Sequence, residues 1–284
     1  MATAKRLFVL QYGAERVSKA LSLVGGDPEH YYWEPLFGAL VETDAGWVLF
    51  DTGMSRANHE SAEVERVYRG GEAATEPLDE RPWHLRPSPP ADRCTWGLPG
   101  DPLVAALAPL GLQPGDLSLA VVSHFHWDHS GGIATLAAAG VPVAVHADEL
   151  AWARSGAPFD AGFDARDWTA PGTQWQTVDA ETEVAPGVAL LPTPGHTPGH
   201  LSCWVTLPGT GSWIFTADAT DLAQNLLDDV PCGSCAGGTA ADEQQAEESL
   251  ALLLARTRET DARLIPGHDQ VVLNAIRHPP GGHR

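Results

Sequence analysis

The sequence is poor in positive charge and has no long apolar segment, and both absences exclude classes of function. It has 17 lysines and arginines against 37 aspartates and glutamates, a formal net charge of −20. A strongly acidic surface repels phosphate backbones, and no stripe rich in lysine and arginine offsets it, so we expect no nucleic-acid partner. No run approaches the roughly 18 uninterrupted apolar residues of a membrane span, so we expect no membrane partner.

Cysteine is also scarce. The four cysteines are Cys94, Cys203, Cys232 and Cys235, and the last two form a CxxC pair. Such a pair can be redox-active or half of a zinc site. Because a second pair and a thioredoxin-like βαβ context are both missing, we interpret Cys232 and Cys235 as two loop thiols.

The N-terminus shows no targeting pattern. Residues 1–6 lead into a short apolar run with no cleavage-like site. A secretory signal peptide would end in such a site. We therefore predict a cytoplasmic protein.

One segment is dense in side chains that bind metals. Residues 123–132 read SHFHWDHSGG and follow an apolar run. Its histidines and aspartate, His124, His126, Asp128 and His129, are ligands that zinc, iron or manganese accept. His124 and His126 project the same way on an extended segment, whereas Asp128 and His129 lie beyond the strand end. One loop can therefore supply ligands to two metals.

Three further residues complete the candidate set. His196, Asp218 and His268 each follow an apolar run, so each is predicted to lie on a loop at a strand end. A lone histidine is usually a surface or hydrogen-bonded residue, but seven such residues in this order favour a metal site. The remaining histidines are predicted not to bind metal: His30, His59, His84, His146, His200, His278 and His283. His200 and Asp51 are predicted to support ligands or their loops.

The order HxHxDH, His, Asp, His resembles the metallo-β-lactamase superfamily, over nearly the whole chain from residue 6 to residue 269. Within it, the sequence is most similar to the N-acyl-homoserine lactonase group. The supporting segments are residues 40–46, 48–54 and 193–200, together with the 22-residue step from His196 to Asp218. The resemblance implies an αββα sandwich, two mixed sheets flanked by helices, in a single domain over residues 1–284. The alternation of strands and helices alone supports only the α/β class.

The resemblance also implies the chemistry. Two divalent metal ions, zinc in the family, would be held by His124, His126 and His196 on one side and by Asp128, His129 and His268 on the other. Asp218 would bridge them. A hydroxide shared by the metals attacks the carbonyl carbon. Asp128 and Asp218 are thus the predicted catalytic carboxylates, with Asp128 also moving a proton to the leaving oxygen. Many relatives are dimers, so a homodimer is expected.

One position departs from the family pattern. The lactonases usually carry a tyrosine three residues after the bridging aspartate, and this chain has Asp221 there. Either another donor replaces that tyrosine, with Tyr31 and Tyr32 as candidates, or the substrate differs and Asp221 receives a cationic group. Trp127, at the variable position of HxHxDH, is a further candidate to line the substrate pocket.

The resulting hypothesis is a dinuclear metal-dependent hydrolase that opens a lactone, with N-acyl-homoserine lactone as the leading substrate. The alternatives are another lactone, ester or thioester. A β-lactam is disfavoured because the ligand set contains Asp128 and Asp218. A flavodiiron-type redox protein is disfavoured because the chain has no room for a flavin domain.

The predicted elements are nine strands and three helices. The strands cover residues 7–11, 38–43, 47–51, 119–123, 141–146, 188–192, 201–207, 213–217 and 263–265. The helices cover about residues 101–110, a segment after Gly132, and residues 240–258, the last with a capping-box pattern at Thr239 and Asp242. Residues 55–100 and 155–180 are predicted to be loop excursions, which either form substrate walls or dimer contacts or are surface loops with no direct role.

Overall fold

Two mixed β-sheets form the centre of the protein. The computed structural model describes residues 2–69, 93–156, 162–235 and 238–284. In spatial order, the seven strands of the first sheet are β4 (Thr95–Gly97), β1 (Arg6–Ser18), β2 (Tyr31–Thr43), β3 (Gly46–Phe50), β5 (Leu117–Val121), β6 (Pro142–His146) and β7 (Gln174–Val178). The five strands of the second are β12 (Arg263–Pro266), β11 (Gly211–Ala217), β10 (Leu201–Leu207), β9 (Val188–Pro192) and β8 (Thr182–Ala185).

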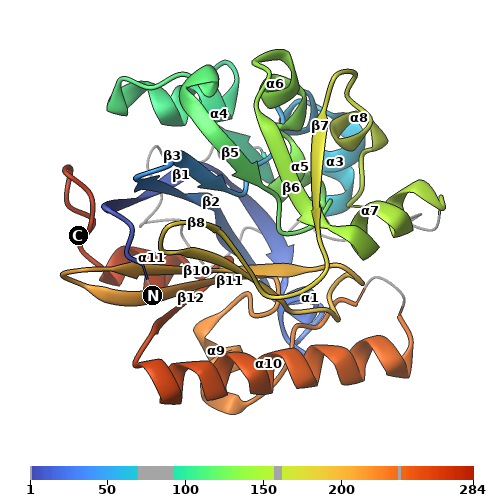
Figure 1. Ribbon diagram of the computed structural model, residues 1–284. Coiled ribbons are helices and arrows are strands. Elements are labelled where there is room, and N and C mark those ends of the chain that lie inside the picture. The colour runs from blue at the N-terminus through green and yellow to red at the C-terminus, as the bar shows by residue number, and fades with distance from the viewer. Residues whose placement is uncertain (1, 70–92, 157–161, 236–237) are drawn as a thin grey trace.

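Helices cover the outer face of each sheet, which confirms the predicted αββα arrangement (Figure 1). The α-helices are α1 (Lys19–Ser22), α2 (Arg56–His59), α3 (Ala62–Tyr68), α4 (Pro102–Leu107), α5 (Trp127–Ser130), α6 (Ile133–Ala138), α7 (Ala147–Arg154), α8 (Ala165–Trp168), α9 (Ala223–Asp228), α10 (Ala240–Thr260) and α11 (Gln270–Ala275). The long helix α10 runs along the second sheet, whereas α4, α6 and α7 lie against the first. None of the described helices has the length and hydropathy needed to cross a membrane.

The central strands of each sheet are buried on both faces, and successive side chains along them belong to different layers. On β10, Cys203 and Val205 pack between the sheets, whereas Trp204 points outward to the cluster that contains Leu253 of α10. Successive side chains of a strand point to opposite faces, so each strand supplies both the central and the outer layer. Double burial explains the continuous apolar runs that predicted most of the strands.

The two predicted loop excursions contain regular structure, so that prediction was wrong. Residues 155–180 hold α8 and the edge strand β7, which pairs in parallel with β6. The segment of β7 reads QWQTV and is largely exposed, so it lacks the apolar alternation that marks a strand. Residues 55–100 hold α2, α3 and β4, and residues 70–92 of that range lie outside the described residues.

Strands β1 and β2 are also longer than predicted. The predicted strands ended at residue 11 and began at residue 38, whereas β1 continues to Ser18 and β2 begins at Tyr31. The added halves include Glu15 and Glu34, which are buried and directly opposite each other on the two strands. Charged residues interrupt the apolar pattern from which a buried strand is predicted. Because charged residues are rarely buried, the pattern did not predict these halves.

The candidate ligands all follow strands whose ends meet at one edge of the sandwich. The loop that begins with His124 follows β5, and His196 follows β9. Asp218 and His268 come directly after the parallel neighbours β11 and β12. Strand pairing thus brings together side chains that lie up to 144 residues apart, from His124 to His268.

Candidate metal centre

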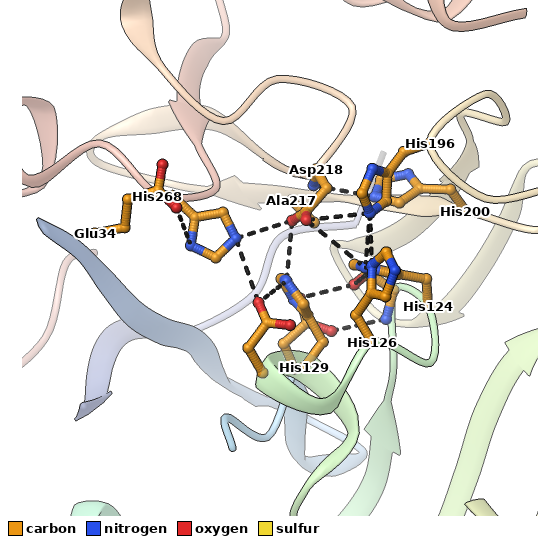
Figure 2. A network of polar contacts seen from close by, with 12 residues as sticks. Glu34, His124, His126, His129, His196, His200, Ala217, Asp218 and His268 are labelled. Carbon is orange, nitrogen blue, oxygen red and sulfur yellow. Dashed lines mark hydrogen bonds and ion pairs between the residues drawn. The ribbon is translucent and has the colours of Figure 1, made fainter. Parts of the chain in front are cut away.

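Three imidazoles and one carboxylate converge in a first cluster (Figure 2). His196 Nε2 lies 2.8 Å from His126 Nδ1 and 3.1 Å from His124 Nε2, and the latter two nitrogens are 2.8 Å apart. Asp218 Oδ2 lies 3.3 Å from His196 Nε2. These four ligand atoms lie within 4.8 Å of one another, a separation that one metal ion can span.

A second cluster shares Asp218 with the first. His129 Nε2 lies 2.8 Å from Asp128 Oδ2 and 2.9 Å from Asp218 Oδ1. His268 Nε2 lies 3.1 Å from the same Asp218 oxygen and 3.6 Å from Asp128 Oδ2. Asp218 therefore offers one oxygen to each cluster.

Hydrogen bonds on the far side of the rings show that the clusters fit metal ions. In three histidines, Nδ1 faces an oxygen that only accepts: His196 faces the Ser234 carbonyl at 2.9 Å, His129 the Asp51 carboxylate at 2.9 Å, and His268 the Pro35 carbonyl at 3.3 Å. In a neutral ring this places the proton on Nδ1 and leaves a lone pair on Nε2. The Nε2 of His129 is buried without a hydrogen-bond partner, although two carboxylates lie close to it. A cation bound between the Nε2 lone pairs and the carboxylate oxygens of Asp128 and Asp218 would interact favourably with all of them.

The electrostatics of the two clusters agree with this interpretation. Burial lowers the pKa of His124 well below its usual value and that of His126 to about 3, so both imidazoles are neutral ligands. Burial also lowers the pKa of His129, but Asp128 and Asp218 outweigh it and raise the pKa overall. Although burial raises the pKa of Asp218, the histidines around it, His129 foremost, hold it well below its ordinary value. The first cluster thus presents neutral imidazoles, and Asp218 presents an ionised carboxylate; both belong to the donor set of a divalent metal site.

The profile of the metallo-beta-lactamase superfamily matches residues 37–268 of this chain. The chain belongs to that superfamily. An N-acyl homoserine lactonase of Bacillus cereus is 27% identical over 230 residues, which cover 81% of each chain.

The chain is also similar to solved structures of N-acyl homoserine lactone hydrolases. An N-acyl homoserine lactone hydrolase with N-hexanoyl-L-homoserine bound at its catalytic metal centre matches with a TM-score of 0.77 and 25% identity, over 97% of both chains. A Bacillus thuringiensis AiiA variant with N-decanoyl-L-homoserine at its active site matches with a TM-score of 0.78 and 25% identity, again over 97% of both chains.

Asp51 holds the HxHxDH loop of this superfamily member in two ways. One carboxylate oxygen accepts from His129 Nδ1, and the other accepts from the Ser123 backbone at 2.7 Å. The neighbouring Thr52 hydroxyl donates to the His129 carbonyl at 2.7 Å. Asp51 was predicted to orient a ligand histidine or to hold the loop, and it contacts both the candidate ligand His129 and the loop backbone.

His200 lies beside the metal-ligand clusters. Its Nε2 accepts from the Asp218 backbone at 3.1 Å, and its Nδ1 lies 2.9 Å from the Thr193 hydroxyl. It thereby joins the loop of His196 to the loop of Asp218, which confirms its predicted supporting role.

Two supporting residues escaped sequence reasoning. Glu149 on α7 is fully buried, and its two oxygens accept from the backbones of Phe125 (3.0 Å) and Gly199 (3.1 Å), so it joins two ligand loops. Burial raises its pKa to about 7. Ser234 holds His196 through its carbonyl. It lies between Cys232 and Cys235, which are free thiols, as predicted. Neither residue carries a sequence signal, because each acts through contacts that are distant along the chain.

A cavity of about 280 Å³ opens over the clusters. Its wall includes the candidate substrate residues Tyr31, Trp127 and Asp221. The Trp127 indole donates to the Tyr68 hydroxyl at 2.5 Å. The fourth candidate, Tyr32, is buried, and its hydroxyl donates to the Glu34 carboxylate.

Three buried carboxyl groups also line this cavity: Glu15, Glu34 and Asp221. Burial raises the pKa of Glu15 and Asp221 well above the usual range and that of Glu34 to about 7. Of these three, only Asp221 was predictable as a pocket residue, because Glu15 and Glu34 belong to no motif.

Proposed function

We propose that this chain is a dinuclear metal-dependent hydrolase that opens the ring of a lactone. The observation that carries the proposal is the pair of ligand clusters that share Asp218 at the floor of a cavity. Relatives named N-acyl homoserine lactonases share the fold over nearly the whole chain. The site geometry and the similarity to these relatives support the proposal together, because a fold alone does not define an activity.

We propose that His124, His126 and His196 hold one metal ion, that Asp128, His129 and His268 hold the other, and that Asp218 binds both. Zinc is the metal we expect, since imidazole nitrogen and carboxylate oxygen are among its usual ligands. Divalent metals at such a site supply a nucleophilic hydroxide at neutral pH and polarise the substrate carbonyl.

The residues of the chain contribute positioning and proton transfer. Asp128 lines the cavity, and its carboxylate is held by His129 at 2.8 Å. Burial raises the pKa of Asp128, but the adjacent His129 lowers it overall, so the group stays ionised and can accept a proton. We propose that Asp128 accepts a proton during the attack on the carbonyl and passes it to the leaving oxygen as the ring opens.

N-acyl homoserine lactone is the leading substrate because the relatives are named for its hydrolysis. Another lactone, ester or thioester is the alternative, since Asp221 stands where the lactonases carry a tyrosine. The predictions of a cytoplasmic homodimer without nucleic-acid or membrane partners belong to this proposal and await their own tests.

A ring-opening assay on the metal-replete protein tests the proposed function. The substrates are short- and long-chain N-acyl homoserine lactones, γ-butyrolactone and a thioester control, followed by proton release and product mass. We expect chelator-sensitive opening of the homoserine lactones. Hydrolysis of the thioester alone would contradict the lactone assignment, and no hydrolysis of any substrate would contradict the proposed function as a whole.

A further inference from the structure

The three carboxyl groups beside the ligand clusters have no lysine or arginine partner among the residues that the structure describes, and only Glu34 lies within ion-pair distance of a histidine, His268, at 3.8 Å. Glu15, Glu34 and Asp221 are 4%, 2% and 5% exposed, and all line the cavity. Glu15 Oε2 and Asp221 Oδ1 are buried without any hydrogen-bond partner in the described part of the chain. Unpaired buried carboxyl oxygens are costly, so they indicate a partner that binds from the cavity.

The placement of Glu15 and Glu34 strengthens this point. They are direct partners across the antiparallel pair β1 and β2, so their side chains lie on the same face of the sheet. Two carboxylates directly opposite on neighbouring strands destabilise a sheet when both are ionised, so this pair favours either a bound proton or a bound cation. Arg16, the one arginine among the residues lining the cavity, does not relieve them. Its guanidinium lies over the Tyr31 ring at 4.6 Å and donates to Cys94 Sγ at 3.8 Å.

A third metal ion is a poor occupant of this site. Glu15, Glu34 and His268 have ligand atoms within 4.8 Å of one another. However, the nitrogen of His268 on that side is Nδ1, which donates its proton to the Pro35 carbonyl and so has no free lone pair. Two carboxylates alone are fewer ligands than a buried metal site normally has. An ammonium group instead needs several acceptors, which the carboxylates supply.

We propose that Glu15, Glu34 and Asp221 form a binding site for an ammonium group of the substrate, close to the carbonyl that is attacked. His268 shows how close this site is to the ligand clusters. Its Nδ1 lies 3.8 Å from Glu34 Oε2, and its Nε2 lies 3.1 Å from Asp218 Oδ1. The ring of His268 therefore separates Glu34 from Asp218, the carboxylate shared by the two ligand clusters. This inference rests on the proposed function and narrows its substrate to a lactone or ester with an amino group a few bonds from the carbonyl.

Two experiments on the metal-replete protein test the inference. The first compares binding of n-butylammonium and n-butanol by calorimetry, which requires no turnover. The second compares kcat/KM for homoserine lactone, which carries a free amine, with that for its neutral N-acetyl form. A charge-assisted contact is worth about a tenfold to hundredfold factor in affinity. We therefore expect n-butylammonium to bind more tightly than n-butanol, and homoserine lactone to have a higher kcat/KM than its N-acetyl form, each by that factor.

Glu15→Gln and Asp221→Asn remove charge without changing shape, and each is expected to reduce the preference at least about threefold to tenfold. Glu60→Gln is the matched control, because Glu60 is a surface residue that pairs with Arg56. Metal content is measured in each variant. Equal binding of n-butylammonium and n-butanol would overturn the inference, as would a third metal ion per chain that the Glu15 variant loses. If the cation binds but no lactone or ester is opened, the proposed function fails while the ammonium site stands.

Discussion

Asp218→Asn is expected to lose nearly all hydrolysis and part of its bound metal. Asp218 is the one residue shared by the two clusters, with Oδ1 2.9 Å from His129 Nε2 and Oδ2 3.3 Å from His196 Nε2. Asparagine keeps one oxygen, replaces the other by an NH₂ group and removes the charge. Substitution of groups that only support metal ligands costs about 10–100-fold in metal affinity or activity, so loss of a shared ligand should lower the rate at least about a hundredfold.

Initial rates and metal content per chain check this expectation together. Asp44→Asn is the matched control, since Asp44 is exposed and pairs with Lys5 away from the site. The control should keep full activity and full metal content. Unchanged hydrolysis in the Asp218 variant would show that the shared carboxylate is not part of the reacting centre.

Glu149→Ala is expected to lower the free energy of unfolding by about 2–6 kcal/mol. The substitution leaves the buried backbone N–H groups of Phe125 and Gly199 without acceptors, and each costs about 1–3 kcal/mol. The two ligand loops also lose their common anchor, so metal binding should weaken. Urea unfolding of the metal-free and metal-replete protein measures both effects.

A graded pair of variants separates this role from a general loss of charge. Glu149→Gln keeps one oxygen acceptor and should lose about half as much stability as the alanine variant. Glu181→Ala removes a half-exposed carboxylate that pairs with Arg256, so it should change stability by less than about 1 kcal/mol. An unchanged unfolding midpoint in Glu149→Ala would refute the anchoring role.

The candidate ligands were predictable because their signals are local. His124 and His126 are two residues apart at the end of an apolar run, and His196, Asp218 and His268 each follow one. Apolar runs predict buried strands, and the ends of neighbouring strands meet. The apolar runs therefore predicted an α/β fold with the ligands on loops at strand ends, whereas the two layers of sheets followed from the resemblance to the metallo-β-lactamase superfamily.

The supporting groups were not predictable, because they depend on contacts between distant segments. Glu149 lies on a helix with a weak apolar stripe, and only the folded chain brings it to Phe125 and Gly199. Glu15 and Glu34 interrupt the apolar alternation of β1 and β2, so both strands were predicted too short. Their burial against the cavity overrides the usual exposure of glutamate. The residues least visible in the sequence thus include two that line the cavity, Glu15 and Glu34.

The most direct test of the account is stepwise return of zinc to metal-free protein, with ring opening of the best lactone or ester measured at each step. Two clusters that share Asp218 predict two ions bound per chain, with most of the activity appearing as the second ion binds. The same titration on Asp44→Asn should follow the same course. Full activity with one ion per chain, or with none, would contradict a dinuclear hydrolase.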